Sequence, residues 1–331
     1  MINFCTLFDS NYSAKGLAMY ESLIMHCSSF HLYIFAFDDK LAKILERMDL
    51  KYVTVVTLED FEDEKLLAVK STRTRGEYCW TCSSSTILYC IEHYNIPSCT
   101  YLDSDLFFFS DPQILIDEMG DDDVLITEHR YTPQYDQTAT SGKYCVQFMT
   151  FKNTPNGLNV LNWWRDACLE WCYARFEEGK FGDQKYLDDW PTRFKGIHIL
   201  QHLGGGVAPW NMQQYIFSRT KNSIMGKELA TGKIFSVIFF HFHDLSCYKK
   251  NIYREFCVTS RGYLLSKNAR DYLYNEYLSA IKRCFTAISK IDNQLDSLSP
   301  KYLNETWYIV FKRIIKSSII RDCYYSFWLK S

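Results

Sequence analysis

The chain has 331 residues, of which 47% are hydrophobic and 17% aromatic, enough to fill the core of one large domain or two modest ones. Its formal net charge of −2 gives no general reason to expect a nucleic-acid-binding protein. The charge is unevenly distributed, however. Residues 246–331 carry 15 Lys and Arg against 7 Asp and Glu, so they contribute +8 and residues 1–245 carry −10.

Thirteen cysteines are scattered without the spacing of a disulfide framework, and an odd number cannot all pair. Cys79 and Cys82 form a C-x-x-C, but no second pair lies at zinc spacing, so we expect both to pack in the core. Because residues 1–3 do not resemble a secretory signal, we expect reduced thiols in the cytoplasm. No apolar run reaches the ~18 residues of a membrane span, so the chain is expected to be soluble or peripheral.

The first sixty residues alternate between apolar runs and stretches with helical spacing. The predicted strands cover residues 2–8, 31–37 and 52–57, and the predicted helices cover residues 13–25 and 40–48. This rhythm predicts an α/β fold with a mostly parallel central sheet. Ligands of such sheets bind at the carboxyl ends of the strands, which makes Thr6, Phe8 and Asp9 candidate binding residues.

Arg73 and Arg75 precede a predicted helix that continues to about Tyr94. Arginines in this position could bind a diphosphate through forked hydrogen bonds. A solvated pair of arginines is the alternative, and the two residues alone would favour it. Arg75 is kept as a candidate diphosphate-binding residue.

Residues 99–112, C-T-Y-L-D-S-D-L-F-F-F-S-D-P, combine a buried strand, two carboxylates and an aromatic run. Asp103 and Asp105 flank Ser104 where the predicted strand ends. Buried like charges raise each other's pKa or require a cation, and a hard divalent ion such as Mg²⁺ or Mn²⁺ would also bind phosphate oxygens. The alternative is an Asx-type turn. The apolar neighbours favour the metal site.

The middle of the chain adds candidates on loops. The polar loop 130–143 is long enough to cover a site. A strand over residues 144–151 and a helix over residues 158–176 follow. Asp183 and Gln184 then open a short helix, where Asp183 could also be a simple cap.

Residues 204–206 are three glycines without the Lys-Ser/Thr of a P-loop. We expect Gly205 to let the backbone approach a ligand, with Trp210 in the wall of the site. A strand over residues 237–242 carries His241, and His243 follows. A core histidine is the usual interpretation, but two histidines in a chain that has a D-x-D favour metal ligation.

These motifs, in this order, resemble the GT-A class of nucleotide-sugar glycosyltransferases. The resemblance is nearest to the retaining family that includes glycogenin and lipopolysaccharide galactosyltransferases, glycosyltransferase family 8, and the chain also looks like bacterial surface-polysaccharide enzymes. It spans roughly residues 1–244. The motifs that carry it are D-x-N-Y at residues 9–12, Y-L-D-x-D at 101–105, the acid–glutamine pair at 183–184 and the histidine motif at 241–244.

The resemblance implies a role for each motif. Tyr12 would lie near the nucleobase, while Asp103, Asp105 and His241, or His243 in its place, would hold Mn²⁺ or Mg²⁺. The acid–glutamine pair would contact the transferred sugar. A nucleotide-sugar donor, with a UDP-sugar favoured, and a glycan or lipid-linked oligosaccharide acceptor are implied as substrates.

Two departures from the family pattern affect donor binding. Cys145 occupies the place of an Asn that contacts the donor sugar, so Gln147 is a candidate replacement. Asp244 replaces the closing glycine, and the Lys-Pro-Trp that normally follows is absent. Lys249 or Lys250 is therefore the candidate lysine for the diphosphate.

The expected reaction is transfer with retention of configuration, in which the leaving phosphate accepts the proton of the attacking hydroxyl. Such a reaction needs electrostatic stabilisation more than a strong base. Two alternatives stay open. One is a metal-dependent phosphohydrolase or nucleotidyltransferase, and the other is a non-catalytic, membrane-associated binding protein on a degenerate scaffold. Donor turnover with and without an acceptor would separate the three.

Beyond Ser246 the strand–helix rhythm is lost, and helices are predicted over residues 271–285 and 302–328. On a helical wheel of the second helix, apolar and aromatic side chains share one side: Trp307, Val310, Phe311, Ile314 and Tyr325. The basic side chains of Lys312, Arg313 and Lys316 lie on the opposite side. This pattern fits a helix on an anionic membrane surface, the alternative being a helix packed on the body of the protein. We therefore predict a catalytic domain, residues 1–245, a helical extension, residues 246–331, and a cytoplasmic location, peripheral on the inner face of the cell membrane.

Overall fold

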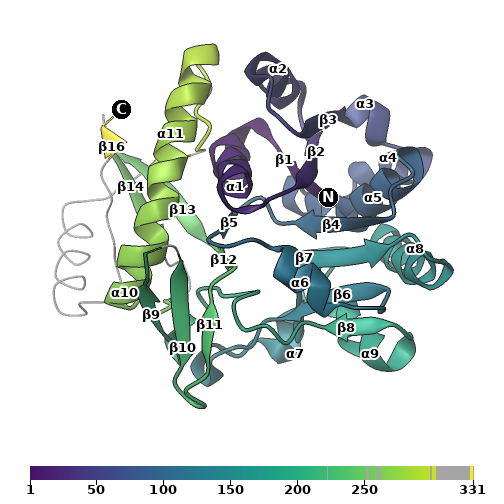
Figure 1. Ribbon diagram of the computed structural model, residues 1–331. Helices are drawn as coiled ribbons and strands as arrows, with labels where there is room; N and C mark the ends of the chain where they lie inside the picture. The colour runs from purple at the N-terminus through teal and green to yellow at the C-terminus, as the bar shows by residue number, and fades with distance from the viewer. Residues whose placement is uncertain (222, 251–252, 259–261, 299, 303–328, 331) are drawn as a thin grey trace.

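A seven-stranded sheet forms the centre of the computed structural model, which describes residues 1–221, 223–250, 253–258, 262–298, 300–302 and 329–330 (Figure 1). The strand order is β3-β2-β1-β4-β7-β6-β8, and β7 runs antiparallel to the others. The bounds are β1 Ile2–Phe8, β2 Phe30–Ala36, β3 Val53–Thr57, β4 Ser98–Leu102, β6 Val124–Glu128, β7 Tyr144–Lys152 and β8 Ile197–Ile199. The predicted α/β fold with a mostly parallel sheet is confirmed.

Strand β1, which is apolar except for the buried residues Asn3 and Thr6, explains why a mostly apolar run predicts a central strand. Ile2, Phe4 and Phe8 contribute to the core on one face of the sheet, whereas Cys5 and Leu7 contribute to the core on the other. Successive side chains of a strand point to opposite faces, so a strand covered on both faces must be apolar at consecutive positions. All seven residues of β1 are buried.

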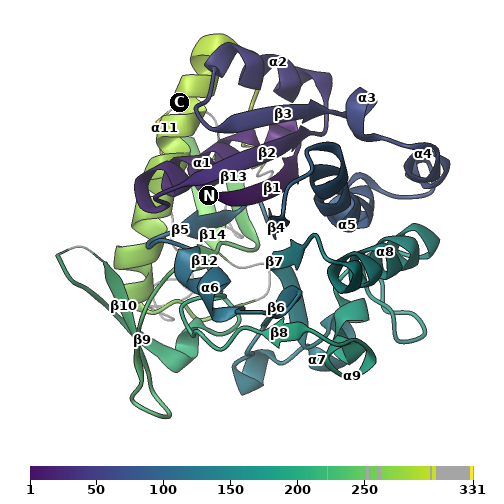
Figure 2. The same ribbon diagram turned by 45° about the vertical axis from the view of Figure 1, so that its right-hand side comes forward.

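Helices cover both faces of the sheet (Figure 2). Helices α1 (Ser13–His26), α2 (Asp39–Met48) and α11 (Asn275–Ile291) contribute to one core, and α5 (Arg75–His93) and α8 (Pro155–Glu170) to the other. The shorter helices are α3 Leu58–Phe61, α4 Glu64–Lys70, α6 Gln113–Glu118, α7 Thr138–Ser141, α9 Trp190–Arg193 and α10 Lys267–Ala269. No helix among the described residues is both long enough and apolar enough to span a membrane.

Local capping sets where the helices begin and end. Thr74 and Glu77 form a capping box at the start of α5. Helix α8 begins and ends earlier than the predicted range 158–176, because Thr154 caps its amino terminus and Trp171 is extended. The Tyr186 hydroxyl donates to the Trp171 carbonyl at 2.8 Å, which satisfies a carbonyl group at this helix end.

The second half of the chain departs most from the prediction. Residues beyond Ser246 were expected to be helical, but β13 (Leu245–Lys250) and β14 (Tyr253–Val258) form an antiparallel hairpin. Tyr, Phe, Cys and Val favour strands, and this overrides the expected helix. The helix predicted over residues 271–285 is confirmed by α11 and the π-helical turn before it. The helix predicted over residues 302–328 is wrong at its first residue, because Tyr302 lies in a strand that pairs with β13, and its remaining residues, 303–328, lie outside the described part of the chain.

Smaller sheets surround the central one. The remaining strands are β5 Leu106–Phe108, β9 Tyr215–Arg219, β10 Ile224–Glu228, β11 Ile234–Ser236, β12 Phe239–His241, β15 Lys301–Tyr302 and β16 Leu329–Lys330. Strands β9, β10 and β11 form an antiparallel sheet, β12 pairs with β5, and β15 and β16 flank the β13–β14 hairpin.

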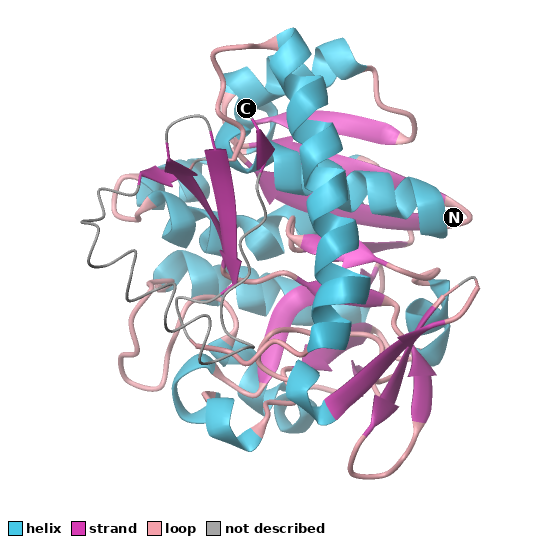
Figure 3. Cartoon of the chain, turned by 90° about the vertical axis from the view of Figure 1, so that its left-hand side faces the viewer, coloured by secondary structure: helices cyan, strands magenta, loops and turns pink. Residues whose placement is uncertain are grey.

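Helix α11 crosses the body of the protein beside α1 (Figure 3). Its Tyr277 is fully buried, with its ring centroid 3.9 Å from that of Phe242 and 5.6 Å from that of Phe107. The predicted domain boundary after residue 245 falls at the start of β13. The division into two domains stays a prediction, and α11 shares its core with the strands that precede the boundary.

Candidate active site

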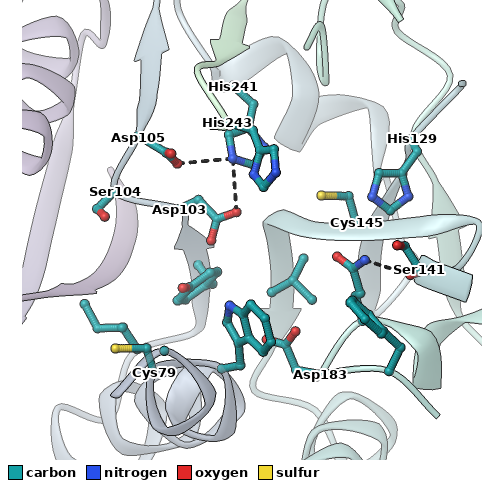
Figure 4. Close-up of a pocket in the computed structure, with 18 of the residues that line it drawn as sticks. Cys79, Asp103, Ser104, Asp105, His129, Ser141, Cys145, Asp183, His241 and His243 are labelled. Carbon is teal, nitrogen blue, oxygen red and sulfur yellow. Dashed lines mark hydrogen bonds and ion pairs between the residues drawn. The ribbon is translucent and has the colours of Figure 1, made fainter. Parts of the chain in front are cut away.

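A cavity of about 520 Å³ lies at the carboxyl ends of β1 and β4 (Figure 4). It gathers most of the candidate residues from five separate parts of the chain. Those that line it are Phe8, Asp9, Tyr12, Arg75, Asp103, Ser104, Asp105, Asp183, Gln184, His241 and His243. The loop over residues 130–143 contributes Tyr131, Gln137 and Ser141, and Trp210 lies in the wall as expected.

Asp103, Asp105 and His241 converge at one point of this cavity. Asp103 and Asp105 flank the turn between β4 and β5, and β12 pairs with β5 so that His241 lies opposite Leu106. His241 Nε2 is 3.1 Å from Asp105 Oδ1 and 3.7 Å from Asp103 Oδ2. One donor atom from each of the three side chains lies within 4.8 Å of the others. Two carboxylates and an imidazole at this spacing fit a divalent ion such as Mn²⁺.

Burial and ion pairing divide the charge among these three side chains. Burial lowers the pKa of His241, but the carboxylate of Asp105 outweighs this effect and raises that pKa well above its ordinary value. Burial likewise raises the pKa of Asp105, yet His241 brings it below the ordinary value. Burial raises the pKa of Asp103 to about 6 despite the attraction of His241. In the absence of metal, His241 and Asp105 therefore form an ion pair, and Asp103 is the less stabilised carboxylate.

Tyr12 and Lys15 support Asp105 from helix α1 and the turn before it. The Tyr12 hydroxyl donates to Asp105 Oδ2 at 3.0 Å and accepts from Lys15 Nζ at 2.9 Å. Lys15 is buried and also donates to the Leu245 carbonyl at 2.9 Å. Tyr12 therefore contacts the carboxylate of Asp105, and its predicted place near the nucleobase stays a prediction. Sequence reasoning missed Lys15, although a lysine one turn after a site residue is a signal.

Arg75 is held by two carboxylates at the end of the cavity that contains Asp9. Its Nε is 2.6 Å from Asp9 Oδ2, and its Nη2 is 3.0 Å from Asp38 Oδ2. Asp38 also accepts from the backbone and hydroxyl groups of Ser10. Arg75 thus ties the first strand to helix α5, and its role as a diphosphate ligand stays a prediction.

Asp183 lies across the cavity from the carboxylate pair (Figure 4), and its neighbour Gln184 also lines the cavity. Asp183 is buried, and its backbone carbonyl accepts from Trp164 Nε1 at 2.9 Å. Burial, followed by the charge of Asp103, raises the pKa of the Asp183 carboxyl to about 7. Gln184 Nε2 donates to the Ser141 carbonyl at 2.7 Å. This bond fixes the amide so that its Oε1 is available as an acceptor in the cavity.

Aromatic side chains form another wall of the cavity. Trp210 Nε1 donates to the His129 carbonyl at 2.9 Å, and the His129 ring stacks on Tyr131 with centroids 4.6 Å apart. Tyr263 comes from the region after β14, and its hydroxyl accepts from Gln137 Nε2 at 3.2 Å. Sequence reasoning missed Tyr131, His129 and Tyr263, because topology rather than a local motif brings them to the site.

Thr6 and Gly205 do not line the cavity. Thr6 is fully buried in β1, and its hydroxyl has no hydrogen-bond partner among the described residues. Gly205 does not line the cavity: a Cβ there would lie 2.5 Å from Leu200 Cδ2, so core packing demands glycine. Lys249 lies in β13, and its side chain and that of Lys250 fall outside the described part of the structure.

Cys145 and Gln147 take different places on β7. Cys145 lines the cavity beside His241 (Figure 4), and burial raises the pKa of its thiol. Gln147 is fully buried and does not line the cavity; its Oε1 lies 2.7 Å from His241 Nδ1. The expectation that Gln147 replaces a donor-sugar contact is therefore not supported, because its side chain faces the histidine.

The sheet order and the placement of the cavity agree with the GT-A fold. The galactosyltransferase LgtC, solved with donor and acceptor sugar analogs, matches with a TM-score of 0.51 and 11% identity over 85% of this chain and 96% of LgtC. The apo form of mouse xyloside xylosyltransferase 1 matches with a TM-score of 0.39 and 16% identity over 60% of this chain and 84% of that protein.

Two proteins of Bacillus subtilis (strain 168) are similar to most of the chain. YfnD is 29% identical over 308 residues, which are 91% of this chain and 95% of YfnD. YfnF is 29% identical over 267 residues, which are 78% of this chain and 86% of YfnF. Both are described as uncharacterized, and no protein-family model matches the chain.

Proposed function

We propose that the protein is a metal-dependent glycosyltransferase. It would transfer a sugar from a nucleotide-diphosphate sugar, with a UDP-sugar favoured, to a glycan or lipid-linked acceptor. The observation that carries the proposal is the convergence of Asp103, Asp105 and His241 opposite Asp183 and Gln184 in one cavity of a GT-A fold. The proposal places the chain near glycosyltransferase family 8 and the enzymes of bacterial surface polysaccharides.

Each group of side chains has a task in this proposal. Asp103, Asp105 and His241 would hold the ion, and an imidazole ligand beside two carboxylates favours Mn²⁺ over Mg²⁺. A divalent ion supplies charge neutralisation for the departing diphosphate. Phe8, Asp9 and Tyr12 would contact the nucleoside, while Arg75 and Lys249 are the candidate cations for the phosphates.

The sugar would lie between the metal ligands and the acid–glutamine pair. The Gln184 amide is oriented by the Ser141 carbonyl, so its Oε1 can face positive charge that develops on the sugar. Asp183 would hold sugar hydroxyl groups by accepting hydrogen bonds when it is ionised. None of these residues is required to act as a strong base, which is consistent with retention and proton transfer to the leaving phosphate.

The decisive experiment measures consumption of a panel of nucleotide sugars with Mn²⁺, in the presence and absence of oligosaccharide and glycolipid acceptors. We expect turnover to depend on acceptor, and the anomeric configuration of the product, read by NMR, to match that of the donor. Faster turnover without acceptor would identify a phosphohydrolase or nucleotidyltransferase. Donor binding without turnover under every condition would identify a non-catalytic binding protein.

A further inference from the structure

Gln147 lies directly behind the candidate metal site, on strand β7. Its side chain is fully buried and forms no part of the cavity wall. A buried amide carries two donor hydrogens and an acceptor oxygen, and burying it without partners is costly. The hydrogen-bond partners of the Gln147 side chain therefore indicate its role beside the candidate metal site.

Two bonds connect Gln147 to both arms of the site. Its side-chain Oε1 is 2.7 Å from His241 Nδ1. Its backbone carbonyl accepts from the backbone N–H of Asp103 at 3.0 Å. One residue of β7 therefore contacts the turn that carries the carboxylates and the strand that carries the histidine.

The surroundings leave Gln147 little freedom. Gly206 has a φ of +106°, and a Cβ at that position would approach Gln147 Nε2 to 3.1 Å. Thr127 Oγ1 lies 3.5 Å from Nε2, on the opposite end of the amide from the histidine. On the histidine side, the Trp210 ring packs edge-on against His241 with centroids 5.3 Å apart. Both partners of the 2.7 Å contact are thus held by packing.

The chemistry of this contact selects one form of the imidazole. A carbonyl oxygen can only accept, so a contact with Oε1 requires a proton on His241 Nδ1, and the proton that a metal displaces is the one on Nε2, which pairs the ring with Asp105. Nε2, which faces Asp103 and Asp105, is then the nitrogen available to a metal. Metal-binding histidines usually have such a partner on the second nitrogen, and its loss typically weakens metal binding about 10–100-fold.

We propose that Gln147 is a positioning residue that holds His241 in the orientation and tautomer needed for metal ligation. This role rests on the proposed function, because it assumes that the carboxylate–histidine site binds a divalent ion. Gln147 supplies the acceptor without adding a third carboxylate to a site that already contains Asp103 and Asp105, so it orients the ring without adding negative charge.

Titration of the metal-free protein with Mn²⁺ alone, followed by electron paramagnetic resonance, tests the proposal. Gln147→Met keeps the volume but removes the acceptor, and Gln147→Asn keeps the amide but shortens its reach. Both are expected to raise the Kd for Mn²⁺ about 10–100-fold. Gln147→Glu restores an acceptor at the same reach. We expect it to bind Mn²⁺ at least tenfold more tightly than Gln147→Met or Gln147→Asn.

The control is Thr127→Val, which alters the far end of the same amide without touching the acceptor and should leave the Kd within about twofold. Urea unfolding of each variant confirms that the protein binding metal is folded. Equal Kd values for the wild type and folded Gln147→Met or Gln147→Asn would overturn the role of Gln147 alone. A wild-type protein that binds no Mn²⁺ would overturn the metal site of the proposed function and this role with it.

Discussion

Asp103 and Asp105 are separated by one residue, yet their surroundings differ. Asp105 is paired with His241 and accepts a hydrogen bond from Tyr12, and its pKa is lowered. The Asp103 carboxylate lies farther from His241, at 3.7 Å from its Nε2, and burial raises the pKa of Asp103 to about 6. The fold therefore stabilises the ionised form of Asp105 but not that of Asp103. A buried carboxylate whose ionised form is not stabilised is typical of a functional site.

The first prediction separates activity from stability at these two residues. Asp103→Asn and Asp105→Asn should each lower transfer by about 100-fold or more, since each removes a proposed metal ligand. Asp105→Asn should also lower the free energy of unfolding by about 3 kcal/mol, because it leaves His241 without its buried partner. Asp103→Asn should raise it by about 1–2 kcal/mol above pH 6, where the wild-type carboxylate is charged; its 29% exposure reduces the gain.

Transfer assays and urea unfolding without metal measure the two effects. The control is His93→Gln, on the surface of α5 and outside the cavity. It is expected to leave the rate of transfer unchanged and to alter the free energy of unfolding by no more than about 0.5 kcal/mol. Equal stabilities of the two Asn variants would contradict the asymmetry, and full activity of either in excess Mn²⁺ would contradict the metal assignment.

Asp183 makes the stability of the protein depend on pH. Its pKa is raised from 3.8 to about 7, first by burial and then by the charge of Asp103. Between about pH 4 and 7 the folded protein retains a proton that the unfolded chain has lost, so stability falls as pH rises through this window. Asp183→Asn should therefore match the wild type near pH 4 and exceed its free energy of unfolding by about 4 kcal/mol at pH 8.

Urea unfolding at pH 4, 6 and 8 in the presence of a chelator checks this prediction. Asp166→Asn, an exposed acid on α8, serves as the control and should follow the wild type at every pH. A difference between Asp183→Asn and the wild type that stays constant with pH would show that Asp183 ionises normally.

The sequence predicts helix α11 but not its place in the core of the protein. Its Tyr277 is fully buried and stacks on Phe242, the residue between His241 and His243 in the sequence. The Tyr277 hydroxyl has no hydrogen-bond partner among the described residues. Tyr277→Ala should lower the free energy of unfolding by about 3–5 kcal/mol through the cavity it leaves. Tyr277→Phe should be neutral or slightly stabilising, because it removes only the unpartnered hydroxyl.

Thermal and urea unfolding of both variants would measure these effects. A small loss for Tyr277→Ala would mean that α11 is an appendage, as the predicted boundary after residue 245 implies. A large loss for Tyr277→Phe would mean that its hydroxyl has a partner and is not simply buried in the core.

At the scale of the whole molecule, local patterns predicted well and long-range pairing did not. The apolar run of β1 and the D-x-D after β4 are local, so sequence reasoning located both. The contacts of Gln147 with His241 and of Tyr263 with Gln137 join residues 94 and 126 positions apart, and no sequence period encodes such pairing. Gly205 was misread for a related reason, because a glycine that packs against Leu200 looks the same in sequence as one that approaches a ligand.

The last prediction concerns the basic tail, whose predicted helix covers residues 302–328 and lies, from residue 303 onward, outside the described residues. The described core extends to Leu298, and the backbone N–H of Ala14 donates to the Ser297 carbonyl, so the body includes residues up to this point. A chain that ends at Leu303 loses the short pairing of β16 with β14 but keeps that core. We therefore expect the truncated protein to melt within a few degrees of the full chain and to retain activity on a soluble acceptor.

Binding to anionic vesicles should be lost with the tail, since it carries the alternating aromatic and basic side chains that favour a lipid surface. Co-sedimentation with vesicles at low and high salt measures this, because electrostatic attraction to the lipid weakens as salt screens it. Neutral vesicles provide the control. If the full chain fails to sediment with anionic vesicles at low salt, or if the truncated chain sediments equally well, the tail has no role at a membrane and the acceptor must be sought among soluble glycans.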